Sequence, residues 1–322
     1  MTGRRPRRGA ASAVRTGPAD AIEIGWGDMA EWYDAKIGDD GDLWHRYLID
    51  PGLLKLIGEV RGLEVLDLAC GNGYLARRYS RSGAARVVGV DSSARIIRLA
   101  RRREAQRPLG VRYEVRDAAD LRGFADASFD LVASNMAIMD IEDAEGAIRE
   151  SARVLRPGGR FVFSICHPCF DLNDRSMWQV ERRPYETRVW RKVSRYRDEG
   201  LQWGAWKLGD GRYGKTRGYH RTLATYARYL SSTGLLVGRL DEPAPLPELV
   251  AQSNQGEFLR EIPLHLVIEA IRIGELSARE GPITRRATRT SARTTRPAGP
   301  RSGSRARRRG SGSSRRGTIP GS

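Results

Sequence analysis

The chain has few of the residues that form cross-links and no long apolar stretch. Its 322 residues include three cysteines and four histidines. Cys70, Cys166 and Cys169 do not make an even set for disulfide pairing, so we expect a reducing, cytoplasmic setting. No apolar run has the length of a membrane span, and none follows the N-terminal arginines, so we expect no secretory signal. An organelle transit peptide, which is also rich in arginine, stays open as an alternative.

Positive charge is concentrated at the two ends of the chain, and the formal net charge is +17. Residues 1–20 contain five arginines and one aspartate, and residues 278–322 contain thirteen arginines and one glutamate, so the part between them carries only +1. The ends have too few large apolar side chains to offset the entropy of ordering. We predict a disordered basic N-terminus over 1–20, a folded domain over 21–274 and a disordered Arg/Ser-rich tail over 275–322.

Short apolar runs alternate with amphipathic stretches through the middle of the chain, which is typical of βαβ units around a parallel sheet. Ahead of them, Trp26, Trp32 and Tyr33 indicate a helical apolar face, and Asp50 before Pro51 predicts a helix N-cap. These segments would be cap helices. The expected strands are Glu64–Leu68, Arg86–Val90, Val111–Val115, Phe129–Ala133, Arg160–Ile165, Leu235–Leu240 and Leu264–Ala270.

Helical periodicity and end signals place two helices in the second half of the pattern. Asp143 can cap a helix that reaches Leu155, and Leu223–Ser232 forms another. Residues 167–219 interrupt the pattern with many aromatic and charged side chains. A long insertion after a sheet strand is more often a lid than a structureless loop, so we predict that residues 167–219 form a substrate lid.

A glycine-rich turn follows the first strand, in the sequence LDLACGNGYLAR from Leu66 to Arg77. Gly71, Asn72 and Gly73, with Ala69 just before them, lie where a strand gives way to a helix. Glycines at such a turn let the backbone approach a ligand closely. Nicotinamide dinucleotide enzymes and methyltransferases both use this arrangement, so the turn alone does not choose between them.

Three aspartates at successive strand ends favour S-adenosylmethionine (SAM). Asp67 would repel a pyrophosphate but attract the ammonium group of SAM. Asp91, followed by Ser92, has the position of a carboxylate that accepts both ribose hydroxyls. Asp117 and the backbone of Ala118 could bind the adenine amino group and a ring nitrogen. Each aspartate alone could instead be a helix cap or turn residue.

The sequence resembles the class I SAM-dependent methyltransferases, of the small-molecule type with a Rossmann-like core. The resemblance covers roughly residues 26–274 and includes VLDLACGNGYLARR, VVGVDSS, SFDLVASNMAIMDI, RVLRPGGRFVFSICHPCF and YHRTLATYARYLSSTG. It implies a doubly wound α/β fold with a seven-stranded mixed sheet in the order 3-2-1-4-5-7-6, the last strand antiparallel. It also implies that Asn135 and Met136 line the cofactor near its methyl group and that Tyr33 closes over the methionyl end.

Aromatic rings attract a sulfonium cation. Trp26, Trp32 and Tyr33 could serve in this way, although packing of an N-terminal helix explains the two tryptophans equally well. Methyl transfer chiefly needs alignment, and a base is needed only for a protonated acceptor. His167 and His220 are the candidate catalytic residues, with structural hydrogen bonding as the alternative.

The segment from Cys166 to Cys169 reads Cys-His-Pro-Cys and suggests two further ideas. A metal site would need more ligands at matching spacing, which the sequence does not offer, so we predict no metal. A Pro-Cys pair also forms the nucleophile of cytosine-C5 methyltransferases, but the surrounding motifs differ. We expect Pro168 to turn the chain out of the sheet.

The sequence therefore predicts an enzyme that methylates a small-molecule acceptor at O, N or C and releases S-adenosylhomocysteine. One alternative is an RNA or DNA methyltransferase tethered by the basic ends, although a nucleic-acid partner is not favoured because the folded part is nearly neutral. Another is a catalytically silent SAM-binding module. No membrane association is expected. The sequence leaves the acceptor, the methylated atom and the oligomeric state open.

Overall fold

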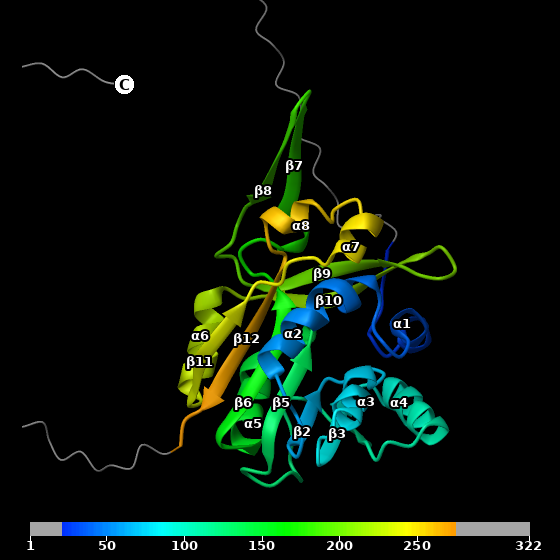
Figure 1. The fold of residues 1–322 in the computed structure, drawn as a ribbon, viewed down its shortest axis with the longest axis vertical. Helices are drawn as coiled ribbons and strands as arrows, with labels where there is room; N and C mark the ends of the chain where they lie inside the picture. The colour runs from blue at the N-terminus through cyan, green and yellow to red at the C-terminus, as the bar shows by residue number, and fades with distance from the viewer. Residues whose placement is uncertain (1–20, 275–322) are drawn as a thin grey trace, which may run out of the picture. The chain divides into compact units, whose positions relative to one another are not determined.

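The computed structural model describes residues 21–274 (Figure 1). The predicted disordered segments 1–20 and 275–322 lie outside this range. A seven-stranded sheet forms the centre, with strands in the order β4-β3-β2-β5-β6-β12-β11. This is the expected order 3-2-1-4-5-7-6. The sheet strands are β2 (Glu64–Leu68), β3 (Arg86–Asp91), β4 (Arg112–Val115), β5 (Phe129–Asn135), β6 (Leu155–Cys166), β11 (Leu235–Asp241) and β12 (His265–Arg272).

The direction of the strands also agrees with the expectation. The five strands from β4 to β6 run parallel, whereas β12 is antiparallel to both β6 and β11. The carboxyl ends of the parallel strands therefore meet at one edge of the sheet, and the start of β12 joins them there. Ligands in open α/β sheets bind at this edge.

Helices cover both faces of the sheet (Figure 1). One face buries apolar side chains of α2 (Asp50–Ile57), α3 (Tyr74–Arg81) and α4 (Ala94–Gln106). The other face buries those of α5 (Ala144–Val154) and α6 (Leu223–Ser232). The predicted helix cap at Asp143 is confirmed, because its side chain accepts the backbone N–H of Gly146.

The segment before the sheet forms the two expected helices, but the predicted helix N-cap at Asp50 is wrong. The short strand β1 (Ile22–Glu23) is followed by α1 (Ala30–Ile37), the π-helical turn η1 (His45–Ile49) and then α2. Asp50 is not an N-cap, because η1 continues directly into α2 and places Asp50 inside the helix. Its side chain is free to turn toward the sheet.

Residues 167–219 form hairpins rather than extended loops. They contain the turn η3 (Asn173–Arg175), the hairpin of β7 (Ser176–Arg183) and β8 (Glu186–Val193), and the hairpin of β9 (Gly200–Lys207) and β10 (Tyr213–His220). The second hairpin adds β1 as a third strand. In Figure 1, β7 and β8 project away from the central sheet.

Short elements complete the described chain. They are η2 (Ile138–Asp140), α7 (Pro247–Gln252) and α8 (Phe258–Glu261). β6 begins at Leu155, earlier than the predicted Arg160, because a register shift opposite Phe129 to Leu131 takes up the Pro-Gly-Gly segment. No helix in the described range has the length and apolar character needed to cross a membrane.

Candidate functional site

The loop between β2 and α3 depends on two glycines with positive φ. Gly71 has φ +55°, and a Cβ there would lie 2.9 Å from the ring of Tyr33. Gly73 has φ +75°, and a Cβ there would lie 2.4 Å from the ring of Tyr113. A side chain at either position would displace an aromatic ring as well as strain the backbone. Ala69 also has positive φ, +53°, which is uncommon for a residue with a Cβ.

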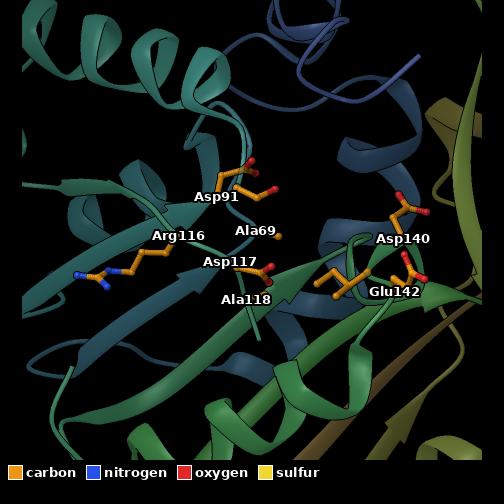
Figure 2. A pocket seen from close by; sticks show the side chains of 9 residues that line it. Ala69, Asp91, Arg116, Asp117, Ala118, Asp140 and Glu142 are labelled. Carbon is orange, nitrogen blue, oxygen red and sulfur yellow. The ribbon is translucent and has the colours of Figure 1, made fainter. Parts of the chain in front are cut away.

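A cavity of about 220 Å³ opens at the carboxyl edge of the sheet beside this loop (Figure 2). It brings together predicted site residues from three strand ends. Ala69 follows β2, Asp91 and Ser92 lie at the end of β3, and Asp117 and Ala118 follow β4. The side chains of Asp140 and Glu142 face them from across the cavity. The complete lining is Ala69, Asp91, Ser92, Arg116, Asp117, Ala118, Asp140, Ile141 and Glu142.

The cavity walls are strongly acidic. Four carboxylates line the cavity, whereas its one cationic residue, Arg116, points away from it in Figure 2 and donates to Glu114 at 2.7 Å. Burial raises the pKa of Asp140 to about 7. Such walls suit a cationic ligand.

Asp91 is held in place by backbone donors. One carboxylate oxygen accepts the N–H of Gly71 at 3.1 Å, and the other accepts the N–H of Ser93 at 2.9 Å. Burial raises the pKa of the Asp91 carboxyl in spite of these bonds. Asp91 therefore ties the glycine loop to the end of β3 and keeps lone pairs for a ligand. Asp117 is ordered in a similar way, because it accepts the N–H of Ala119 at 2.9 Å.

Asp67 is the predicted ammonium-binding residue, and its surroundings fit that role. Its side chain is only 2% exposed, and its Oδ2 atom has no hydrogen-bond partner among the described residues. Burial raises the pKa of Asp67 to about 7, and the charges of Asp91 and Asp50 raise it further. A buried carboxylate oxygen without a donor is rare and calls for a partner, which the ammonium group of SAM would supply.

Tyr33 and Asn72 connect helix α1 to the glycine loop. The Tyr33 ring lies against Gly71. It packs edge-on with the Trp26 ring, and the two ring centroids are 5.8 Å apart. The Asn72 side chain points to α1 rather than into the cavity. Its amide donates to the Asp34 carboxylate at 3.0 Å and to the carbonyl of Gly38 at 2.8 Å. Asn72 thus positions the helix that carries Tyr33.

Asn135 ends β5 and Met136 follows it, but neither residue lines the 220 Å³ cavity. The Asn135 amide donates to Asp50 Oδ1 at 2.9 Å and to the Tyr74 hydroxyl at 2.8 Å, and its oxygen accepts the Ser164 hydroxyl at 2.5 Å. Met136 has φ +51° and packs against an apolar cluster beside η1. These residues lie on the α2 side of the strand ends.

The two candidate catalytic histidines are buried, and each is engaged in a hydrogen bond. His167 Nε2 lies 2.9 Å from Glu242, and its Nδ1 accepts the N–H of Cys169 at 3.1 Å. His220 Nε2 donates to the Tyr196 carbonyl at 2.7 Å. Neither histidine lines the cavity. Both are therefore occupied by the protein itself, and a catalytic role for either remains a prediction.

The sequence does not mark three further residues at this edge, of which Asp50 and His265 are buried. Asp50 had been interpreted as a cap, Asp140 lies in the turn after β5, and His265 begins β12. Each comes near the other site residues only through the tertiary fold, and no local spacing marks it. Within residues 21–274, no group of three or more His, Cys, Asp or Glu side chains could hold a metal ion.

The known proteins that this chain resembles are methyltransferases. A family model described as a methyltransferase domain matches residues 66–163. Demethylmenaquinone methyltransferase of Tropheryma whipplei strain Twist is 36% identical over 115 residues, which are 35% of this chain and 46% of that protein. Ubiquinone biosynthesis O-methyltransferase of Xanthomonas oryzae pv. oryzae strain PXO99A is 30% identical over 136 residues, which are 41% of this chain and 55% of that protein. The chain spans about half the length of these curated relatives.

A solved structure extends the likeness to nearly the whole described range. The SAM-dependent methyltransferase from Mesorhizobium loti is 29% identical, with a TM-score of 0.61, over 73% of this chain and 100% of that chain. The strand order and the antiparallel last strand agree with the fold that the sequence resemblance implied. Residues 66–163 therefore form a methyltransferase domain, and the chain has the fold of the class I SAM-dependent methyltransferases, for which SAM is the cofactor.

Proposed function

We propose that this protein transfers a methyl group from SAM to a small-molecule acceptor. The observation that carries the proposal is the set of carboxylates at neighbouring strand ends, with one oxygen of Asp67 buried and unpaired. A ligand that is cationic at one end and carries a ribose and an adenine at the other matches this set. The two curated relatives are named for demethylmenaquinone and for ubiquinone biosynthesis, which supports a small-molecule acceptor.

Each part of the cofactor has residues that suit it. Asp67 would hold the ammonium group, Asp91 and Ser92 the ribose hydroxyls, and Asp117 with the Ala118 backbone the adenine. A cavity of about 220 Å³ lies below the range of 300–1,000 Å³ usual for whole small-molecule sites. It would therefore take the adenosyl part, while Tyr33 and the glycine loop enclose the methionyl part.

When bound, SAM supplies an electrophilic methyl group on a positively charged sulfur. The protein then has to align the acceptor and exclude water, since the cofactor activates the methyl group itself. Asn72 and Tyr33 hold α1 over the glycine loop, and Asn135 fixes the end of β5 through three hydrogen bonds. These contacts between side chains and backbone groups fix the elements around the site relative to one another.

We propose that residues 167–219 act as the lid of this site. Trp206 of β9 contacts Trp26 at 5.4 Å and Trp32 at 6.2 Å between ring centroids. The Tyr219 hydroxyl of β10 donates to Glu142 in the cavity wall at 3.0 Å. The insertion and the N-terminal segment thus meet beside the cofactor cavity. The three free cysteines fit a cytoplasmic setting, which we retain as part of the proposal.

The direct test has two stages. Isothermal titration of the purified protein with SAM measures cofactor binding. Incubation with SAM and a metabolite extract, followed by mass spectrometry, then searches for compounds that gain one methylene unit. Binding with such a product supports the proposal. Binding without any methylated product would favour a silent SAM-binding module, and an absence of SAM binding would reject the site assignment.

A further inference from the structure

A buried polar cluster, distinct from the carboxylates of the cofactor cavity, lies at the same edge of the sheet. Val267 of β12 and Ala133 of β5 pack in the core under α2. Because side chains alternate along a strand, His265 and Asn135, two residues away on each strand, lie on that same face. Asp50 at the start of α2 accepts a hydrogen bond from Asn135 at 2.9 Å. His265 and Asp50 therefore share one side of the edge where Asn135 ends.

His265 differs from the other three histidines of the chain. His45 bonds Asp42 at 2.8 Å, His167 bonds Glu242 and His220 bonds the Tyr196 carbonyl. His265 is only 7% exposed, yet within residues 21–274 neither of its ring nitrogens makes a hydrogen bond, and Nδ1 is fully buried. Buried polar side-chain atoms in native proteins nearly always have partners. The free Nδ1 atom therefore indicates a ligand group.

Asp50 has a second buried acceptor atom. Its Oδ1 atom accepts the Tyr74 hydroxyl at 2.9 Å in addition to the Asn135 amide, whereas Oδ2 has no partner among the described residues. Burial raises the pKa of the Asp50 carboxyl. For His265, burial lowers the pKa to about 3, and the charges of His45 and His167 lower it further, so the ring is neutral. Both free atoms would accept a hydrogen bond from a ligand.

Half-buried apolar side chains lie next to these atoms. Trp44 beside η1 has its ring centroid 6.3 Å from that of His265. Met136, at the end of β5, and Phe170, after β6, pack with Trp44 around one small apolar cluster, as does Trp178 of β7. Their partial exposure leaves surface for contact with another molecule. Aromatic walls of this kind suit a planar, apolar compound.

We propose that His265 is the residue that binds the methyl acceptor and takes its proton, and that the acceptor is a planar, largely apolar molecule presenting a hydroxyl group. This inference rests on the proposed methyltransferase function. The hydroxyl donates to Nδ1 of His265, while Trp44, Met136, Phe170 and Trp178 contact the apolar part. The glycine-rich motif does not predict this role, because His265 lies on β12, far from that motif along the chain.

The chemistry balances with a neutral imidazole as base. The acceptor oxygen forms a bond to the methyl carbon as the carbon–sulfur bond breaks, the electron pair of that bond stays on sulfur, and the hydroxyl proton passes to Nδ1. One positive charge disappears at sulfur and one appears on His265, so the net charge of the site is constant. An oxygen that is being methylated becomes strongly acidic, so a weak base is sufficient.

The test uses binding, so that it does not depend on finding the natural acceptor. The full-length protein is saturated with S-adenosylhomocysteine, and the affinities of naphthol and its methyl ether, methoxynaphthalene, are measured by quenching of tryptophan fluorescence. We expect the wild-type protein to bind naphthol about tenfold more tightly, because only naphthol can donate to His265. His265→Phe should keep its affinity for the ether and bind naphthol no better.

Two controls make the outcome decisive. Tyr185→Phe removes an exposed hydroxyl from the turn between β7 and β8, outside the apolar cluster, and should keep the preference for naphthol. In the wild-type protein, the ring-nitrogen NMR signal of His265 should shift with naphthol and stay in place with the ether, which requires no variant. A wild-type protein without the preference, a preference that survives in His265→Phe, or an unmoved signal would overturn the proposal. Failure of S-adenosylhomocysteine to bind would instead reject the proposed function itself.

Discussion

At the scale of single residues, Asp67 combines full burial with an unpaired oxygen. The pKa of its carboxyl is raised from 3.8 to about 7. A carboxyl whose pKa is higher in the folded state stabilises the fold below its unfolded pKa, and this contribution is lost as the pH rises through about 7. In the cofactor-free protein, the ionised Asp67 carboxylate therefore opposes folding. An ammonium ligand would reverse this effect, which is why we expect the residue to matter for binding rather than for stability.

Replacing Asp67 with Asn tests this reasoning. The amide keeps the shape and removes the charge, so the affinity for SAM should fall at least about tenfold. The midpoint of thermal unfolding of the free protein at pH 8 should stay the same or rise, because a buried charge is removed. Titration calorimetry and calorimetric unfolding measure the two effects. Asp126→Asn, at an exposed residue paired with Arg153, is the control and should change neither value much. An unaltered affinity in Asp67→Asn would contradict the assignment.

The dependence of SAM binding on pH follows from the same residue. Below about pH 7, Asp67 must lose a proton before it can pair with the ammonium group, so affinity should fall by up to about tenfold per pH unit. Asp140, in the cavity wall, also has a pKa of about 7 and would add to the slope. Titrations between pH 5.5 and 7.5 on Asp67→Asn and Asp140→Asn separate the two. If the wild-type affinity does not change over this range, neither carboxylate is coupled to the ligand.

What the sequence could predict at this scale depends on distance along the chain. Asp91 and Asp117 were expected to lie together because each follows a strand, and the ends of parallel strands meet. Asp50 and His265 could not be found in this way. Asp50 reaches the site because η1 runs without a break into α2, and His265 because β12 enters the sheet from the opposite direction. Neither event has a local signal.

At the scale of elements, the turn between β2 and α3 shows how backbone conformation and packing combine. Gly73 and Gly62 have the same positive φ, +75°. Gly62 is the third residue of a turn that the Leu63 N–H closes on the Val60 carbonyl at 3.0 Å, a position that takes a left-handed glycine. A Cβ at Gly73 would lie 2.4 Å from Tyr113, whereas a Cβ at Gly62 would have no neighbour within 4 Å. The two glycines thus share a φ value and differ in the contact with an aromatic ring. This difference makes them a matched pair for mutation.

We predict that Gly62→Ala lowers the free energy of unfolding by about 1–2 kcal/mol, the cost of a side chain in the left-handed region. Gly73→Ala should lose that amount and at least about 1 kcal/mol more, because Tyr113 must move. It should also weaken SAM binding, since Gly73 belongs to the cofactor loop. Urea unfolding followed by circular dichroism measures the stabilities. Equal losses in the two variants would show that Tyr113 moves aside without cost.

The elements of the sheet were predictable because each strand is a short apolar run between helical segments. The insertion was harder, because its four strands carry aromatic and charged residues without regular alternation, and most of the β7 and β8 side chains are exposed. Such hairpins are held by cross-strand pairs and not by a buried face. Trp178 illustrates the difference, since residues of a distant segment anchor it: its indole N–H donates to Gln255 at 3.1 Å, and its ring centroid lies 5.5 Å from that of Phe258.

At the scale of the whole molecule, the distribution of charge separates the two main functional hypotheses. Nearly all of the excess positive charge lies in residues 1–20 and 278–322, and the cavity in the folded part is lined by four carboxylates. Because the folded part is nearly neutral and its cavity is acidic, it offers a phosphate backbone little attraction, which favours a small-molecule acceptor. Any affinity for nucleic acid should then depend on the basic ends.

Removing residues 278–322 tests this division. The shortened chain keeps every strand of the sheet and every residue of the cavity, so its SAM affinity and its midpoint of thermal unfolding should match those of the full chain. Binding to duplex DNA at low salt, measured by gel mobility shift, should weaken, because thirteen arginines are lost. If the shortened chain instead kept tight, steeply salt-dependent DNA binding, the folded domain itself would contact phosphates. The acidic cavity would then be a poor guide to the acceptor, and a nucleic-acid substrate would become the better hypothesis.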